Sequence, residues 1–285
     1  MSPSAALVDE DPAVSRAGSK PSAVVRSGWY AGAVRHYEDP AYYEHAYRER
    51  QADVGFYEDA AKEFGGPILE YGVGSGRIAL SIARAGLDIT GIDLSAPMLR
   101  AFKQRLSSEG QEVADRVTLK RGDMRNVRLK ARFPLIIAPF NTVLHLYTRT
   151  CMERFLERVR RHLRRGGRFL FDFSVPRPAD LGADTERWYG GPRFRHPTSG
   201  EVVKYRERFF YDPLHQVLSM WMRFTPKSGK HSYVPLTHRQ YFPQEMETLL
   251  HYNGFTDIRF RSDFQDELPH AATDTLVVSC RAKSG

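Results

Sequence analysis

The chain has 285 residues, of which 41% are hydrophobic and 27% charged, the composition of an ordinary soluble globular protein. This length suits one large domain or one domain with a sizeable insertion, and no apolar run is long enough to span a membrane. The N-terminus lacks the basic start and apolar core of a secretory signal. The only cysteines, Cys151 and Cys280, belong to no CxxC pair, so we expect a cytoplasmic protein with neither a disulfide framework nor a metal site.

The net charge of +8 is concentrated in one segment. Residues 149–168 contain eight arginines against two glutamates, a net of +6. One interpretation is a basic face for nucleic acid. The other is a solvated helix face whose cations lie near the helix C-terminus, where the helix dipole favours them. The sequence leaves both open.

The first elements in chain order are a tail and a helical segment. Residues 1–28, rich in Ser, Ala, Pro and Gly, predict a disordered tail. Asp39 followed by Pro40 predicts the start of a helix that stops at Gly65 and Gly66. We therefore expect residues 29–65 to form an N-terminal helical lid.

From residue 66, short apolar runs alternate with amphipathic stretches. The apolar runs predict strands at 67–71, 87–93, 116–123, 133–140 and 167–174. The amphipathic stretches predict helices at 77–86, 95–110 and 148–167. Such alternation favours a parallel sheet with helices on both faces and right-handed crossovers.

The pattern changes after Pro176. Residues 201–226 predict two strands joined by a turn around Asp212 and Pro213, and residues 231–242 predict a third strand. We expect an antiparallel β insertion over 184–242, which could also serve as a dimer surface. A helix over 243–254 and strands over 255–262 and 274–282 close the chain, so the core comprises 66–183 and 243–285.

A glycine-rich loop follows the first strand of this core. Gly72, Gly74 and Gly76 stand at alternate positions before a helix, where they allow tight turning and close approach of the backbone to a ligand. A dinucleotide-binding G-x-G-x-x-G needs its third glycine one position later, where Arg77 stands. The spacing therefore disfavours a nicotinamide dinucleotide.

Acidic residues stand at the ends of three predicted strands. Glu70 precedes the glycine loop, where a carboxylate suits an ammonium better than a pyrophosphate. Asp93 can accept both hydroxyls of a ribose, and Asp123 can accept an adenine amino group. Loop and acids together describe a ligand with an amino-acid end, a ribose and an adenine, and without phosphate.

Four stretches carry a family resemblance: LEYGVGSG at 69–76, GIDLSAPML at 91–99, RGDM at 121–124 and IIAPFN at 136–141. Over about residues 66–176 and the closing strands, the chain resembles the class I S-adenosylmethionine-dependent methyltransferases. The resemblance implies a doubly wound, seven-stranded, mostly parallel α/β fold of Rossmann-like type, with S-adenosylmethionine as cofactor and S-adenosylhomocysteine as its product.

The resemblance also assigns expected roles at the cofactor site. It implies that Glu70 and the loop hold the methionine portion, that Asp93 holds the ribose, and that other residues contact the adenine or line the floor below the sulfonium. The residues concerned are Gly72, Gly74, Ser75 and Gly76 in the loop, Leu94, Met98, Asp123 and Met124 at the adenine, and Phe140 with Asn141 at the floor.

The N-terminal segment is rich in tyrosine. Its rings could form a lid that faces the sulfonium and an amine substrate, or they could pack the leading helix onto the core. The chain is similar in layout to macrolide-sugar and glycine N-methyltransferases, which carry tyrosines before the first motif and a β-rich insertion, and this favours the lid. On that interpretation Tyr37 lies at the cofactor, Tyr43 is catalytic, and Tyr42 and Tyr47 bind substrate.

Further acceptor-side residues follow the fourth strand and the insertion. Asn141 would lie near the transferred methyl and His145 could accept a proton, although the two could instead cap and pack a short helix. By strand alternation Arg239 and Tyr241 share one face and His238 lies on the other. Arg239 could grip a substrate carboxylate. The predicted catalytic residues are Tyr43, Asn141, His145 and His238, and the predicted substrate-binding residues are Tyr42, Tyr47, Arg239 and Tyr241.

These observations predict methyl transfer to a nitrogen or oxygen of a small molecule, in secondary metabolism. An RNA or DNA methyltransferase and a non-catalytic cofactor-binding module are the alternatives. Nucleic-acid amino-methyltransferases usually show Asn or Asp, two prolines and an aromatic residue after the fourth strand, which differs from Ala138-Pro139-Phe140-Asn141. We therefore expect a small-molecule partner, no nucleic acid and no membrane, and leave a homodimer open.

Overall fold

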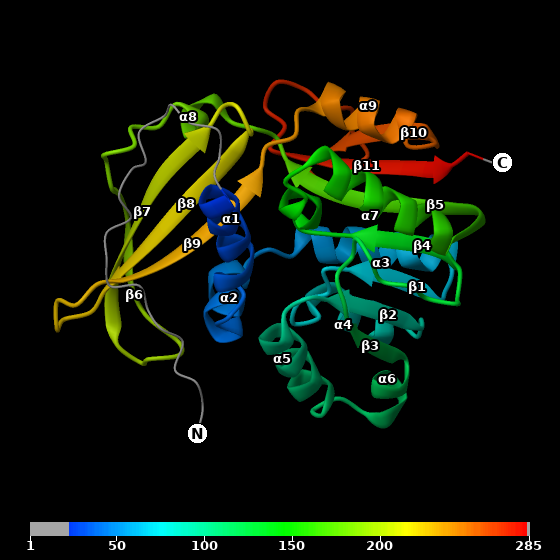
Figure 1. Cartoon of the computed structure of the whole chain (residues 1–285). Helices are drawn as coiled ribbons and strands as arrows, with labels where there is room; N and C mark the ends of the chain where they lie inside the picture. Colours follow the sequence, from blue (N-terminus) through cyan, green and yellow to red (C-terminus); the bar gives the residue numbers. More distant parts are fainter. Residues whose placement is uncertain (1–22, 284–285) are drawn as a thin grey trace. The chain divides into compact units, whose positions relative to one another are not determined.

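A computed structural model describes residues 23–283 of the chain (Figure 1). These residues form two compact units, and each is described by itself. The first unit comprises residues 23–46 and 177–239, and the second comprises residues 47–176 and 240–283. Over residues 23–283, no helix is both long and apolar enough to cross a membrane.

The second unit is built on a seven-stranded sheet in the order β10-β11-β5-β4-β1-β2-β3 (Figure 1). Its strands are β1 (Ile68–Tyr71), β2 (Ile89–Asp93), β3 (Val117–Arg121), β4 (Phe133–Ala138), β5 (Leu163–Ser174), β10 (Phe255–Ser262) and β11 (Thr275–Ala282). Neighbours from β3 to β5 pair in parallel, and β11 runs antiparallel to both β5 and β10. The predicted seven-stranded, mostly parallel sheet is confirmed.

Helices cover both faces of this sheet, as the sequence predicts. They are α3 (Ala52–Phe64), α4 (Arg77–Arg84), α5 (Ala96–Leu106), α6 (Gln111–Asp115), η1 (Thr142–His145), α7 (Arg149–His162) and α9 (Pro243–Tyr252). Residues of α7, η1 and α9 share one buried cluster with Leu69 and Tyr71, whereas residues of α3, α4 and α5 share another with Ile68. Because side chains alternate along a strand, Glu70 lies on the α3 side of the sheet.

The first unit contains a four-stranded antiparallel sheet in the order β6-β7-β8-β9. Its elements are α1 (Ala23–Arg35), α2 (Pro40–Tyr47, whose last residue belongs to the second unit), α8 (Pro178–Leu181), β6 (Tyr189–Arg195), β7 (Val202–Asp212), β8 (Val217–Thr225) and β9 (Ser232–Arg239). The antiparallel insertion and its turn after Asp212 are confirmed, and β6 is an additional strand that the sequence pattern did not indicate. Tyr42 packs against this sheet in a small core with Met222, Phe224 and Leu236.

Three predicted boundaries were wrong. Residues 23–28 belong to α1 instead of a disordered tail, and residues 1–22 lie outside the described part. The helix expected from Pro40 to residue 64 is interrupted between α2 and α3, where the carbonyl of Arg50 accepts a hydrogen bond from the Arg77 side chain. Helix α7 ends at His162 because Leu163 is extended and pairs with Phe133, and Gly166 has a φ of 76° that no α-helix accommodates.

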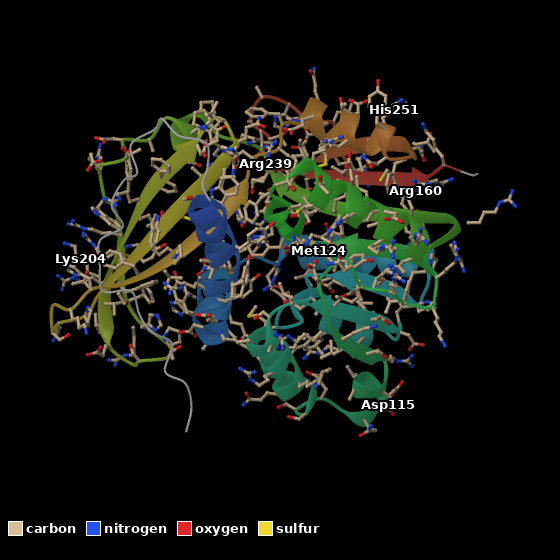
Figure 2. All side chains as sticks on the ribbon, viewed as in Figure 1. Asp115, Met124, Arg160, Lys204, Arg239 and His251 are labelled. Atoms are coloured by element: carbon tan, nitrogen blue, oxygen red, sulfur yellow. The ribbon has the colours of Figure 1, made fainter. Side chains whose placement is uncertain are left out.

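The arginines of residues 149–168 do not share one face. Arg158 and Arg168 are 9% and 6% exposed, and Arg168 pairs with Asp257 at 2.7 Å. On the exposed side of α7, Arg161 pairs with Glu157 at 2.7 Å across one helical turn, and Arg160 (Figure 2) donates to the backbone oxygen of residue 253. These contacts favour a solvated helix face over a nucleic-acid surface.

The end of α7 is tied to the sheet through a buried histidine. The backbone N–H of Leu129 donates to His162 Nε2 at 3.1 Å, so the neutral ring carries its proton on Nδ1 and donates it to the Tyr71 oxygen at 2.6 Å. Burial, followed by the charges of Arg158, Lys120 and Arg132, lowers the pKa of His162 to about 4. Protonation at Nε2 would break the bond to Leu129, so the fold requires the neutral ring.

We expect this histidine to make stability fall in acid. The pKa of His162 is near the ordinary histidine value of 6.5 in the unfolded chain and about 4 in the folded chain, so the stabilisation is complete above pH 6.5 and is lost as pH falls toward about 4. The free energy of unfolding in urea, measured across that window, should drop more steeply for the wild type than for His162→Gln. Parallel pH profiles of the two proteins would contradict the assignment. Burial also lowers the pKa of His145, which is why the comparison is made between variants.

Candidate functional site

The loop between β1 and α4 requires glycine at two of its positions. Gly72 has a φ of 71°, and a Cβ added there would overlap the side chain of Thr142. Gly76 has a φ of 83°, and a Cβ there would overlap the buried ring of Phe102. Left-handed backbone and close packing together exclude larger residues. Ser75 between them is 3% exposed, and its carbonyl accepts from Arg105.

Gly74 differs from the other two loop glycines. Its φ is 55°, but a Cβ there would meet only the Met98 Cε at 3.3 Å and the Gly72 oxygen at 4.0 Å. Its N–H donates to Asp93 Oδ2 at 2.8 Å. Gly74 is half-buried, so its backbone is partly accessible at the carboxyl ends of β1 and β2, where ligands bind in open α/β sheets.

Glu70 presents a buried carboxylate oxygen to this edge of the sheet. The residue is 3% exposed, and its Oε2 has no hydrogen-bond partner among the described residues. Burial raises the pKa of Glu70 well above its usual range, Arg77 opposes that rise, and Asp93 and Asp53 add to it. A buried acceptor without a donor is costly, so a ligand ammonium would supply both the missing hydrogen bond and a counter-charge.

A buried ion pair lies behind Glu70. Asp53 in α3 is fully buried and receives two hydrogen bonds of 2.6 Å from the guanidinium of Arg77, the first residue of α4. The guanidinium carbon of Arg50 lies 4.6 Å from the centre of the Phe140 ring, and that of Arg77 lies 5.5 Å from it. Tyr47 meets the same ring edge-to-face at 4.8 Å. These contacts join α3, α4 and the end of β4 into one cluster.

Asp93 ends β2 and orders the two turns beside it. Its Oδ1 accepts from the backbone N–H of Ser95 at 2.7 Å, and its Oδ2 accepts from Gly74. Burial raises the pKa of this carboxyl, and the backbone N–H groups oppose the rise. Each carboxylate oxygen retains a second lone pair, which fits the two hydroxyls of a ribose. Next to it, Leu94 is 53% exposed and Met98 is 1% exposed, so Leu94 offers the accessible apolar surface.

Asp123 already has a strong partner. Arg125 contacts both of its carboxylate oxygens, with Nη2 2.6 Å from Oδ2 and Nε 2.9 Å from Oδ1. Burial raises the pKa of Asp123, but the hydrogen bonds from Arg125 outweigh it and the pKa is lowered. Met124, labelled in Figure 2, is partly buried against the core cluster that contains Tyr71. A contact of Asp123 or Met124 with adenine stays a prediction.

A tight turn follows β4. Phe140 and Asn141 both have positive φ, 53° and 62°. Asn141 stands at the N-terminus of η1 without capping it, and its Oδ1 accepts from the backbone N–H of Ser174 at 2.7 Å. His145 ends η1, with its Nδ1 3.5 Å from the Tyr147 hydroxyl, and burial lowers the pKa of His145 to about 4. This histidine is neutral at physiological pH and a weak base.

Tyr241 belongs to the core of the second unit. It is 2% exposed, and its hydroxyl donates to the carbonyl of Leu146. The C-terminal end of η1 is therefore braced by a side chain that the sequence assigns to substrate binding.

The remaining predicted residues lie in the first unit. The rings of Tyr37 and Tyr43 lie 5.7 Å apart, and each also contacts His36. Tyr42 is 6% exposed, its hydroxyl lies 3.7 Å from the Met222 sulfur, and burial raises its pKa to about 12. His238 and Arg239 are adjacent at the end of β9 and so point to opposite faces of its sheet, and Figure 2 labels Arg239. Their roles with the cofactor or acceptor stay predictions.

Sequence reasoning missed two fully buried acids, Asp53 and Asp172. Asp172 accepts a hydrogen bond of 2.7 Å from Tyr57 on α3. Both acids stand among apolar residues, Asp172 within the run FLFDFS of β5. Since a buried carboxylate must be paired, an acid inside an apolar strand is the signal that could have found it.

Comparison with known proteins gives matches to methyltransferases. Residues 68–167 match the family described as "Methyltransferase domain". The chain is 27% identical over 216 residues to YqeM from Bacillus subtilis, a protein whose name describes it as a methyltransferase. The match covers 74% of this chain and 82% of that protein.

Solved structures show the same fold. The CcbJ methyltransferase from Streptomyces caelestis matches with a TM-score of 0.71 and 23% identity, over 82% of this chain and 90% of its own. CalS10 from Micromonospora echinaspora, an amino pentose methyltransferase of calicheamicin biosynthesis solved with S-adenosylmethionine bound, matches with a TM-score of 0.62 and 21% identity, over 83% and 95%.

Proposed function

We propose that the chain is a class I S-adenosylmethionine-dependent methyltransferase that transfers a methyl group to a nitrogen or oxygen of a small-molecule acceptor. The methyltransferase-domain match over residues 68–167 and the fold shared with solved methyltransferases support this proposal. S-adenosylmethionine is the methyl donor, and S-adenosylhomocysteine is the product. The observation that carries the proposal is the pairing of two features at one sheet edge. Glu70 holds a buried carboxylate oxygen without a donor among the described residues, and Asp93 accepts a hydrogen bond from the half-buried backbone of Gly74.

The bound cofactor supplies an activated methyl group, so the protein's task is to bind, orient and exclude water. Glu70 would receive the ammonium of the methionine portion. Asp93 would accept the ribose hydroxyls, and Leu94 would cover the adenine. The Phe140 ring would line the site, and its contacts with Tyr47 and Arg50 hold the ring in place.

If the acceptor is an amine that binds in its neutral form, the reaction requires no general base from this chain. His145 is a poor general base because burial lowers its pKa to about 4. Nitrogen acceptors therefore fit the proposed site better than hydroxyls, which need a base. The amino pentose acceptor of CalS10 supports an amino sugar as the first class to test, and its pathway supports a role in secondary metabolism.

The test follows release of S-adenosylhomocysteine by the full chain, at two salt concentrations, with amino sugars, simple amines, hydroxy acids and tRNA as acceptors. We expect turnover with an amine that changes little with salt. Turnover only with tRNA, falling steeply as salt rises, would instead establish a nucleic-acid methyltransferase. Tight binding of S-adenosylhomocysteine without turnover of any acceptor would favour a non-catalytic module.

A further inference from the structure

The turn after β4 holds Phe140 in a backbone conformation that phenylalanine disfavours. Phe140 and Asn141 are neither glycine, yet both have left-handed backbone, with φ values of 53° and 62°. Such a conformation costs free energy for residues with a Cβ and persists only where the surroundings enforce it. The contacts that hold this turn therefore determine the position of the side chains on it.

Strand β5 supplies the enforcement. Asp172 is fully buried beside the end of β4, and its Oδ1 accepts from the backbone N–H of Phe140 at 2.8 Å. Its Oδ2 accepts from the backbone N–H of Asn141 at 3.3 Å. Two residues further along β5, the N–H of Ser174 donates to the Asn141 side chain at 2.7 Å. Both backbone donors of the turn thus meet one carboxylate, and the turn is fixed to the neighbouring strand.

A residue of α3 holds the Asp172 carboxylate in place. The Tyr57 hydroxyl donates to Asp172 Oδ1 at 2.7 Å. Burial raises the pKa of Asp172 to about 6, and the hydrogen bonds from Tyr57 and Phe140 oppose that rise, as does the charge of Arg50, whereas Asp53 adds to it. Asp172 is thus an acceptor for three donors from α3 and the turn, which accounts for an acid at the centre of an apolar strand.

We propose that Asp172 is a positioning residue of the methyltransferase site, which holds the Phe140–Asn141 turn in its binding conformation before the cofactor arrives. The Phe140 ring, at 4.8 Å from Tyr47 and 4.6 Å from Arg50, is the group so positioned. A turn that is already ordered spares the ligand the cost of ordering it, so affinity for the cofactor depends on Asp172 without contact between them. This inference rests on the proposed cofactor site.

Asp172→Asn tests it by two readouts that need no acceptor. The amide keeps the volume but has one acceptor oxygen in place of two, so one backbone N–H of the turn loses its partner. We expect amide hydrogen exchange at Phe140 and Asn141 to accelerate about tenfold in the free protein, and the dissociation constant of S-adenosylhomocysteine to rise by a similar factor. Saturating S-adenosylhomocysteine should restore slow exchange.

Tyr57→Phe is the matched control, because it removes a donor to the same carboxylate while leaving both backbone contacts of the turn. Its exchange at residues 140 and 141 should match the wild type. Asn141→Ala disturbs the turn without touching the buried acid, and should reproduce both effects if Asp172→Asn does not fold.

The outcomes separate this inference from the proposed function. If the wild type does not bind S-adenosylhomocysteine, the proposed function falls, and this inference with it. If the wild type binds but the variants bind equally tightly, or the turn exchanges no faster in them, the inference alone is overturned.

Discussion

Replacing Arg77 by methionine is expected to destabilise the second unit by about 3–5 kcal/mol, the usual cost of removing one partner from a buried ion pair. Asp53 is fully buried and receives two hydrogen bonds of 2.6 Å from the Arg77 guanidinium. Methionine fills similar volume but removes both hydrogen bonds and leaves Asp53 with only the more distant charge of Arg50, whose Nε lies 3.4 Å from Asp53 Oδ2. Arginine at a helix N-terminus is unfavourable by the helix dipole, so its position at the start of α4 is explained by Asp53 and not by helix propensity.

Arg84→Met is the matched control, because Arg84 ends the same helix. Its side chain is 56% exposed and its ion pair with Glu109 lies at the surface, where such pairs contribute at most about 1 kcal/mol. Urea unfolding should be followed by far-ultraviolet circular dichroism, since Trp29, Trp188 and Trp221 all lie in the first unit and none lies in the second. Equal losses for the two variants would show that the Asp53 pair contributes no more than a surface bridge.

The alternation of apolar runs and amphipathic helices predicted the sheet of the second unit because that pattern reflects burial on two faces. Motif positions followed, since Gly72–Gly76 and Asp93 are fixed by the strand ends that precede them. The pattern failed where a tertiary contact overrides local preference. At the break between α2 and α3, the carbonyl of Arg50 accepts a hydrogen bond from Arg77, which is distant in sequence. Strand β6 lacks clear alternation, with Gly190, Gly191 and Pro192 inside it.

The hydrogen-bond partners of the acidic site residues also could not be predicted from the sequence. The spacing placed Asp93 and Asp123 at strand ends, but only the fold shows that Arg125 engages Asp123 and that Asp93 braces the loop at Gly74. Asp172 escaped notice because its three donors come from α3 and from the turn after β4, and no local pattern joins these segments. Long-range hydrogen bonds, and not element types, are what the chain's one-dimensional pattern conceals.

Replacing Asp93 by alanine is expected to weaken binding of S-adenosylhomocysteine by about 1–3 kcal/mol, which is roughly fivefold to 150-fold in the dissociation constant. Two losses add. The ribose hydroxyls lose their acceptor, and the N–H of Gly74 loses a 2.8 Å bond that fixes the loop. The affinity of Asp93→Asn should lie between those of Asp93→Ala and the wild type. The amide keeps one acceptor oxygen, but its NH2 group faces one of the two backbone N–H groups that donate to Asp93 in the wild type.

Asp88→Ala separates a site effect from loss of one acid on the same strand. Asp88 precedes β2 at the end opposite Asp93, and its side chain is 69% exposed in a surface pair with Arg116 at 3.3 Å. Calorimetric titration should give this variant the wild-type affinity. Because Asp93 also orders the loop, amide exchange at Gly74 should accelerate in Asp93→Ala even without ligand, and ligand affinity should fall with it. Wild-type affinity in Asp93→Ala would remove Asp93 from the cofactor site, and faster exchange at Gly74 with unchanged affinity would show that the loop does not hold the cofactor.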